Sequence, residues 1–168
     1  MINDHLKMSA AGLQLLKDLE SCRKLPYDDQ TGKSITRWMP TATIGYGHLI
    51  LGPEWESFKN GISAKTANDL LASDIASREN AVKRAINQPL KQHQYDACLI
   101  LTYNIGATAM KQSSVTKLIN DPQAVTPHAS LELAWMAWNK SKGKIMRGLT
   151  LRRAIEWRLF SSGIYHYR

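Results

Sequence analysis

The chain reads ESCRKLPYDD at residues 20–29 and TIGYGH at residues 43–48. These two stretches bring the carboxyl groups of Glu20 and Asp29 close in sequence to the hydroxyl group of Thr43. Hydrolysis of a glycosidic bond requires one carboxyl group as the acid, a second as the base, and a polar group that holds the attacking water. These three side chains are therefore the candidate catalytic set of the chain.

The residues around the start of this stretch predict a helix over residues 9–22 that is capped by Ser9. Its apolar face is formed by Leu13, Leu16 and Leu19. Glu20 lies four residues after Leu16 and therefore on the same face of the helix. A carboxyl group in that setting is poorly solvated, which favours its neutral, proton-donating form. The alternative interpretation is a glutamate at the edge of the core that forms an ion pair.

Residues 24–60 contain too many glycines and prolines for a helix. Short strands are predicted at Lys33–Trp38 and Thr41–Leu51, in a small antiparallel sheet of two or three strands. From residue 61 onward, the hydrophobic spacing predicts helices instead. These helices begin near Ser63, Lys91, Ser113, Thr126 and Thr150, and a basic loop covers Gly143–Gly148. The fold class is therefore α+β with segregated parts, and a cleft is expected beside the sheet.

The 168 residues carry a formal net charge of +8, which favours polyanions such as nucleic acid, anionic membranes or acidic cell-wall polymers. No apolar run reaches the roughly 18 residues that a membrane-spanning helix needs. Residues 1–8 are polar and do not resemble a signal peptide. Cys22 and Cys98 lie far apart in the sequence, which predicts free thiols rather than a metal site or a disulfide framework.

Several motifs together resemble those of the phage-type lysozymes, or endolysins. They are LLKDLE at residues 15–20, YDD at 27–29, TIGYGH at 43–48, PL at 89–90, QYDA at 94–97, YNIG at 103–106 and GL at 148–149, followed by Arg152, Arg153 and Glu156. The motifs occur in the order expected for the family. The resemblance extends from about residue 12 to about residue 160.

The resemblance implies one lysozyme-like domain over residues 1–168. Its parts would be a small antiparallel β lobe at about 24–60 and a larger helical lobe at about 61–168 with the N-terminal helix at 9–22, with a cleft between the lobes. The implied activity is that of a muramidase, which hydrolyses the β-1,4 bond between N-acetylmuramic acid and N-acetylglucosamine in peptidoglycan. Two carboxyl groups suffice for this chemistry, so neither a cofactor nor a metal ion is expected.

The resemblance also implies a role for each residue of the site. Glu20 is the general acid, Asp29 holds or activates the water, and Thr43 positions that water in an inverting mechanism. The carboxyl groups of an inverting pair lie about 6.5–9.5 Å apart, which leaves room for the water. The implied substrate-binding residues are Gly47, Leu49, Tyr103, Asn104 and Ser113.

The sequence departs from the family pattern at two places. Ser21 follows the glutamate where the family usually has glycine, and the thirteen residues between Asp29 and Thr43 are more than usual. The longer segment leaves Asp28 open as a replacement for Asp29, and Thr41 as a replacement for Thr43. The spacing from Glu20 favours Asp29, and adjacency to the following Ile-Gly pair favours Thr43.

Two other functions stay open on the sequence alone. A lytic transglycosylase would cut the same bond without water and would not need Asp29. A non-catalytic wall-binding module would use only the basic surface and the aromatic side chains. No helix-turn-helix, zinc or RNA-binding signature supports nucleic acid as a partner. The expected partner is therefore the glycan strand of peptidoglycan, and either Arg152 or Arg153 is expected to orient Glu20.

The expected site of action is the bacterial cell wall. The chain is expected to be a monomer that is made in the cytoplasm without a signal peptide and does not insert into a membrane. It would reach the wall through a holin or a secretion machine. A phage endolysin and a secreted antibacterial effector both fit these features, and an immunity or inhibitor protein stays open as a further partner.

Overall fold

The fold is taken from a computed structural model that describes residues 1–166. The chain divides into two compact units, and the confirmed α+β class follows from their contents. One unit is Lys17–Ala76 and holds the sheet; the other combines Met1–Leu16 with the chain from Ser77 onward and is helical. The division falls within two helices, α1 (Ala10–Glu20) and α3 (Ala64–Ala85).

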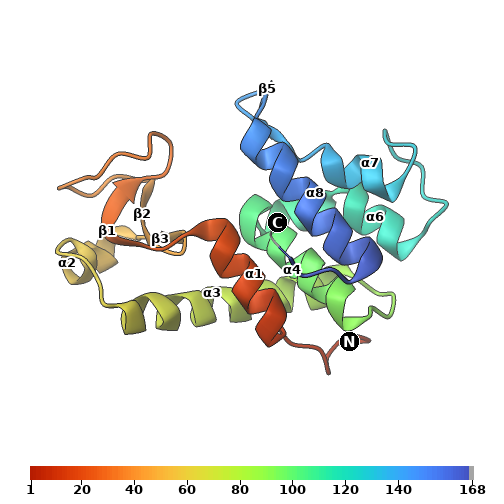
Figure 1. The fold of residues 1–168 in the computed structure, drawn as a ribbon, viewed down its shortest axis with the longest axis horizontal. Coiled ribbons are helices and arrows are strands. Elements are labelled where there is room, and N and C mark those ends of the chain that lie inside the picture. The colour runs from red at the N-terminus through yellow and green to blue at the C-terminus, as the bar shows by residue number, and fades with distance from the viewer. Residues whose placement is uncertain (167–168) are drawn as a thin grey trace. The chain divides into compact units, whose positions relative to one another are not determined.

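The sheet of the first unit has three antiparallel strands in the order β1-β2-β3 (Figure 1). The strands are β1 (Arg23–Asp28), β2 (Ala42–Gly45) and β3 (His48–Leu49). Gly45 and Gly47 have φ values of +65° and +89°, a backbone region that glycine adopts without the steric cost of a Cβ. The GYG sequence therefore lets the chain reverse within two residues between β2 and β3.

Strand β2 forms the centre of this unit. All four of its residues are buried, and Ala42, Ile44 and the nearby Ile50 form an apolar cluster. Partly buried side chains that pack against the cluster come from the loop before β2, from α2 (Trp55–Phe58) and from the start of α3. A short 3-10 helix, η1 (Gly52–Glu54), precedes α2. The site residues that follow are thus attached to a packed strand.

The predicted strand at Lys33–Trp38 is wrong. The segment is a loop that makes a single bridge, between Tyr27 and Ser34. Besides β3, the strand that pairs with β2 is β1, which the sequence did not predict because its segment contains many turn residues. The register of β1 against β2 shifts between Arg23 and Tyr27, and this interval contains Pro26, which has no N–H group to donate.

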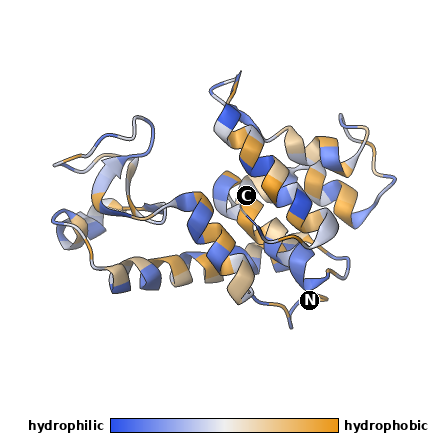
Figure 2. Cartoon of the chain, in the orientation of Figure 1, coloured by the Kyte–Doolittle hydropathy of each residue, from blue (hydrophilic) through white to orange (hydrophobic). Residues whose placement is uncertain are grey.

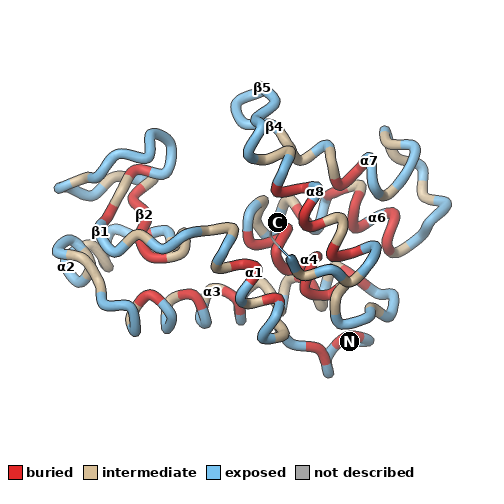
Figure 3. Tube along the Cα trace, viewed as in Figure 1, coloured by how far each residue is buried: buried red, intermediate tan, exposed pale blue. Residues whose placement is uncertain are grey.

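The helical unit is built around α4 (Gln92–Ile105). Nine consecutive residues, Tyr95–Tyr103, are buried, which is the pattern of a helix covered on all sides (Figure 3). The other helices of this unit are α5 (Ala107–Gln112), α6 (Ser114–Asn120), α7 (Leu131–Met136) and α8 (Arg147–Ser162). The colouring of Figure 2 shows apolar and polar residues alternating along α3, as expected for an amphipathic helix.

The starts of three helices are confirmed by their serine caps. The hydroxyl groups of Ser9, Ser63 and Ser113 accept hydrogen bonds from N–H groups in the first turns of α1, α3 and α6. Gly106 at the end of α4 and Gly163 at the end of α8 have positive φ values of +88° and +71°. Local chemistry therefore sets these boundaries.

Other details of the helices are corrected. Helix α7 begins after Ser130, whose hydroxyl accepts from Leu133 N, and not at Thr126. The predicted basic loop is a hairpin of β4 (Lys140–Ser141) and β5 (Lys144–Ile145), and α8 begins before Thr150. In α1, the buried residues are Gly12, Leu15 and Leu16, whereas Leu13 and Leu19 are only half-buried.

Two further predictions concern cysteines and membranes. Cys22 is exposed and Cys98 is buried, and both are free thiols, as the sequence predicts. Within residues 1–166, none of the helices combines the length and the apolar character that a membrane crossing requires.

Candidate active site

Glu20 is the last residue of α1, and the next residue turns the chain toward β1. Its side chain is half-buried. Ser21 has a φ of +56°, and its N–H group donates to Lys17 O at 3.1 Å. This left-handed conformation closes the helix and is one that glycine adopts most readily. The sequence difference at residue 21 therefore falls at a position with a demanding backbone.

The register of the sheet places Thr43 beside Tyr27. These two residues are direct partners in the pairing of β1 with β2, and Asp28 pairs with Ala42. Side chains alternate between the faces of a strand, so Tyr27 and Thr43 share a face that is opposite to that of Asp28. Asp29, one residue beyond the strand, is exposed, and its N–H group donates to Thr41 O at 3.1 Å.

The pKa of the Tyr27 phenol is affected by the charges of both predicted catalytic carboxyl groups. The pKa of its phenol is raised, first by burial and then by the negative charges of Asp29 and Glu20, while Arg23 acts in the opposite direction. The Arg23 guanidinium lies 4.1 Å from the centre of the Tyr27 ring. Tyr27 and Arg23 were not among the predicted site residues, although Tyr27 belongs to the YDD motif.

Thr43 is only 4% exposed, and its hydroxyl donates to Thr41 O at 3.1 Å. With its proton directed at that carbonyl, the oxygen of the hydroxyl keeps its lone pairs for a second donor. A water molecule can supply such a donor. Thr43 therefore has the hydrogen-bonding capacity that a water-positioning residue needs.

Asp28 and Thr41 are engaged with each other. The Asp28 carboxylate accepts from the hydroxyl groups of Thr31 and Thr41, both at 2.6 Å, and from Gln30 N at 3.1 Å. The Thr31 and Thr41 hydrogen bonds hold the pKa of Asp28 below its usual value. Both residues thus fix the base of the loop after β1, which supports Asp29 and Thr43 as the site residues.

The residues around β3 differ in their burial and in their polar contacts. Gly47 is half-buried, and Leu49 is exposed at the end of β3. His48 Nδ1 lies 3.0 Å from Asp74 Oδ2, and its Nε2 lies 3.7 Å from Glu54 Oε2. These contacts link the end of the sheet to α3 and η1, and they are consistent with a structural role for His48.

The other three predicted substrate-binding residues belong to the helical unit. Tyr103 is 7% exposed, with the Arg78 guanidinium 4.4 Å from its ring centre. Asn104 is exposed, and its Oδ1 accepts from Arg153 at 2.9 Å. Ser113 is 5% exposed, and its hydroxyl donates to Met110 O at 2.7 Å in addition to capping α6. Among these three, the amide group of Asn104 is the most accessible.

A buried ion-pair cluster holds α8 against its neighbours. Glu156 accepts from Arg152 Nε at 3.0 Å, from Arg153 at 2.7 Å and from Trp135 Nε1 at 3.1 Å. Arg153 also donates to Asn104, so the cluster reaches a predicted substrate-binding residue. The pairing of Arg152 or Arg153 with Glu20 stays a prediction.

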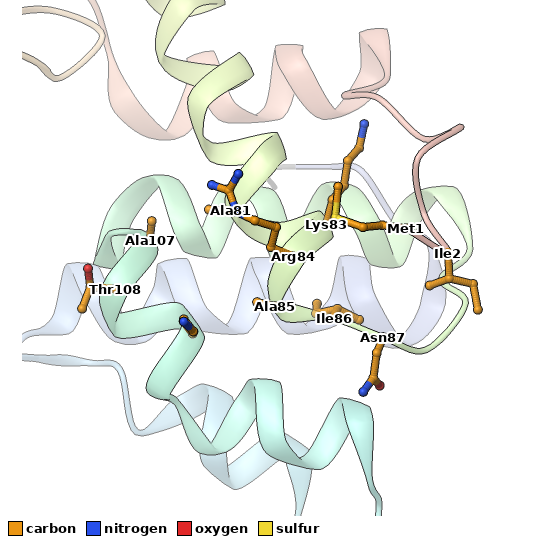
Figure 4. Close-up of a pocket in the computed structure, with 11 residues that line it drawn as sticks. Met1, Ile2, Ala81, Lys83, Arg84, Ala85, Ile86, Asn87, Ala107 and Thr108 are labelled. Carbon is orange, nitrogen blue, oxygen red and sulfur yellow. The ribbon is translucent and has the colours of Figure 1, made fainter.

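A pocket of about 810 Å³ lies in the helical unit (Figure 4). Basic side chains of Lys83, Arg84 and Lys111 line it together with apolar residues near the end of α3 and the start of α5. None of the predicted site residues lines this pocket. Among residues 1–166, no group of three or more His, Cys, Asp or Glu side chains is arranged to hold a metal ion.

Comparisons with known proteins agree with the motifs. The Phage lysozyme family model matches residues 17–156. The endolysin of Bacillus phage PZA is 34% identical over 161 residues, covering 94% of this chain, and the chain spans only 56% of that relative's length. The endolysin of Acyrthosiphon pisum secondary endosymbiont phage 1 is also 34% identical, with 94% of this chain and 99% of the relative covered.

A solved structure agrees over a similar extent. The endolysin from Escherichia coli O157:H7 phage FAHEc1 has a TM-score of 0.74 and 30% identity, and the match covers 96% of this chain and 98% of that chain. The family prediction is thus confirmed by sequence and by fold. The chain belongs to the phage lysozyme family.

Proposed function

We propose that this chain hydrolyses the β-1,4 bond between N-acetylmuramic acid and N-acetylglucosamine in peptidoglycan by an inverting mechanism. The observation that carries the proposal is the pairing of Thr43 with Tyr27 across the sheet, next to the two residues Asp28 and Asp29. The charges of Asp29 and Glu20 both contribute to the raised pKa of the Tyr27 phenol, which supports it. Membership of the phage lysozyme family supports the substrate class.

In this mechanism, Glu20 is neutral and donates its proton to the glycosidic oxygen as the bond to the anomeric carbon breaks. Asp29 is ionised and accepts a proton from the attacking water, whose oxygen forms the new bond to that carbon. Thr43 accepts a hydrogen bond from this water, because its own proton is directed at Thr41 O. The exposed position of Asp29 and the half-buried position of Glu20 favour this division of roles.

The substrate would lie along residues that offer backbone, apolar and amide contacts. Gly47, Leu49 and Asn104 are the best placed by exposure and by available polar groups. Tyr103 and Ser113 are buried and engaged, so their contribution would be to shape and hold the groups around them. The chain would function as a single monomeric domain without a metal ion or cofactor.

The relatives include several phage endolysins, which supports a proposal about the biological setting. The chain would act on the bacterial cell wall after release by a holin or a secretion machine. An immunity or inhibitor protein is a further proposed partner. Neither nucleic acid nor insertion into a membrane is part of the proposed function.

The decisive test is digestion of purified sacculi followed by mass spectrometry of the products. Reducing N-acetylmuramic acid ends are expected. Glu20→Gln and Asp29→Asn should each lower the rate by about 10²–10⁴-fold while the fold is kept. Asp69→Asn, an exposed carboxylate on α3 that pairs with Lys65, is the matched control and should keep wild-type activity.

The alternatives predict other products. Ends with 1,6-anhydromuramic acid would identify a lytic transglycosylase, for which Asp29→Asn should have little effect. Sacculi that stay intact but retain the protein would identify a binding module. Either result would overturn the proposed hydrolysis.

A further inference from the structure

The loop between Asp29 and Thr43 encloses a surface pocket of about 670 Å³. Its lining includes Asp28, Lys33, Arg37, Trp38 and Met39, and it lies entirely within the unit that carries Glu20 and Asp29. This loop is also the segment in which the sequence is longer than the family pattern. The pocket is therefore a feature that the catalytic chemistry itself does not require.

Hydrogen bonds hold the loop in a defined shape. Asp28 N donates to Lys33 O at 2.9 Å, and Ile35 N donates to Pro26 O at 3.1 Å. Arg23 donates to Gly32 O at 2.7 Å. The Asp28 carboxylate adds its bonds to the hydroxyl groups of the loop. A ligand would therefore meet a pocket that is already formed, which lowers the entropic cost of binding.

The charge available to a ligand in this pocket is positive. Lys33 and Arg37 are exposed, and within residues 1–166 no ion pair joins either of them to a carboxylate. Asp28 is buried, and its oxygens are occupied by two hydroxyl groups and one N–H group. The pocket thus presents two cations and favours a carboxylate-bearing ligand.

Trp38 supplies a fixed apolar surface beside these cations. Its Nε1 donates to Ile50 O at 3.0 Å, and its ring lies close to Gly52, yet the side chain is still 43% exposed. The Trp38 ring is therefore held in place and offers an apolar face beside the two cations, on which an apolar part of a ligand can pack.

We propose that this pocket is an accessory subsite that binds the acidic peptide stem carried by the muramic acid of the glycan strand. The inference rests on the proposed function, because that function brings peptidoglycan to Asp29. Asp28 lines the pocket and is the last residue of β1, immediately before Asp29, so the pocket and the proposed base lie at the same end of this strand. The peptide stem bears free carboxylates and is attached to that sugar, so its chemistry matches Lys33, Arg37 and Trp38.

The test compares two substrates that differ only in the peptide: glycan strands with peptide stems, and the same strands after amidase treatment. The double variant Lys33→Gln/Arg37→Gln should raise KM about fivefold for stem-bearing strands, with kcat unchanged, and leave the stripped strands unaffected. Trp38→Ala should act in the same direction, and Trp38→Phe should retain most of the affinity.

The control is Lys24→Gln/Lys65→Gln, which makes the same change of charge on the same unit outside the pocket. An equal loss on both substrates, or an equal loss in the control, would mean general electrostatic attraction and would overturn the subsite. No loss on stem-bearing strands would overturn it as well.

A binding measurement separates this inference from the proposed function. Calorimetry with the Glu20→Gln protein uses a muropeptide and the corresponding peptide-free disaccharide. Tighter binding of the muropeptide that disappears in Lys33→Gln/Arg37→Gln supports the subsite whether or not the wild-type protein cleaves either strand. Equal affinity for the two probes contradicts it, and absence of cleavage by the wild type counts only against the hydrolysis.

Discussion

Tyr27 is the residue that the predicted site organises around, and its ring and its hydroxyl can be tested separately. Tyr27→Phe keeps the surface on which Arg23 lies, so kcat should fall by no more than about threefold. Tyr27→Ala removes the ring that lies against the Arg23 guanidinium and beside Thr43 in the sheet, so it should lower kcat by more than about tenfold. Both are measured with glycan strands as the substrate.

The pH profile adds a second measurement for Tyr27. Burial and the two nearby carboxylates raise the pKa of the phenol, so it stays neutral across the working pH range. The acidic and basic limbs of the activity profile should therefore be the same in Tyr27→Phe as in the wild type. A displaced basic limb would show that the phenol itself titrates in the reaction.

Asp28 gives a prediction about acid stability. Its hydrogen bonds lower the pKa of the folded state below the usual value of about 3.9, so the native state favours the ionised form. Its stabilising contribution is complete above that pH and is lost as the pH falls through the lowered pKa. Asp28→Asn should lower Tm at pH 7, and the difference from the wild type should shrink below about pH 4. A constant difference down to pH 2 would contradict this.

At the scale of elements, Ser21 joins α1 to β1 in a left-handed conformation. A side chain in this conformation costs about 1 kcal/mol of folding free energy relative to glycine. Glycine, however, also raises the conformational entropy of the unfolded chain, which offsets part of this gain. Ser21→Gly should therefore leave Tm equal or raise it by a few degrees, as measured by thermal denaturation. Ser21→Val should lower Tm clearly, since a branched side chain tolerates this φ poorly.

The cluster around Glu156 fixes α8 to α7 and α4. Glu156→Gln would leave two buried arginines without their carboxylate, so the free energy of unfolding should fall by about 3–5 kcal/mol. Glu132→Gln, on the exposed face of α7, is the control and should change stability little. Urea denaturation of the three proteins measures both effects, and a small loss for Glu156→Gln would mean that the arginines find other partners.

Element boundaries show which parts of the fold the sequence can predict. Serine caps and terminal glycines act within three or four residues, so α1, α3, α4 and α6 begin or end close to the predicted positions. Thr126 fails as a cap because its hydroxyl binds His128 N in a local turn, while Ser130 caps the helix instead. The start of a helix is thus predicted wrongly where two possible capping residues lie within a few residues of each other.

Strand pairing and site geometry depend on contacts between distant residues. β1 contains a proline and few β-branched residues, so it is recognised only through its partner β2. The choice between Asp28 and Asp29 likewise depends on Thr31 and Thr41, whose hydroxyl groups meet Asp28 only once the loop is folded. Neither contact leaves a periodic signal in the sequence.

For the whole molecule, the two cysteines have unequal access. Cys98 is fully buried, so thiol reagents do not reach it. Burial also raises the pKa of its thiol, which lowers the fraction of reactive thiolate. Cys22 is exposed and stands two residues after Glu20. The native protein should therefore take up one maleimide per chain and the denatured protein two, as counted by mass spectrometry. A fluorophore can thus be attached two residues from the proposed general acid, giving a reporter of glycan binding that needs no engineered cysteine.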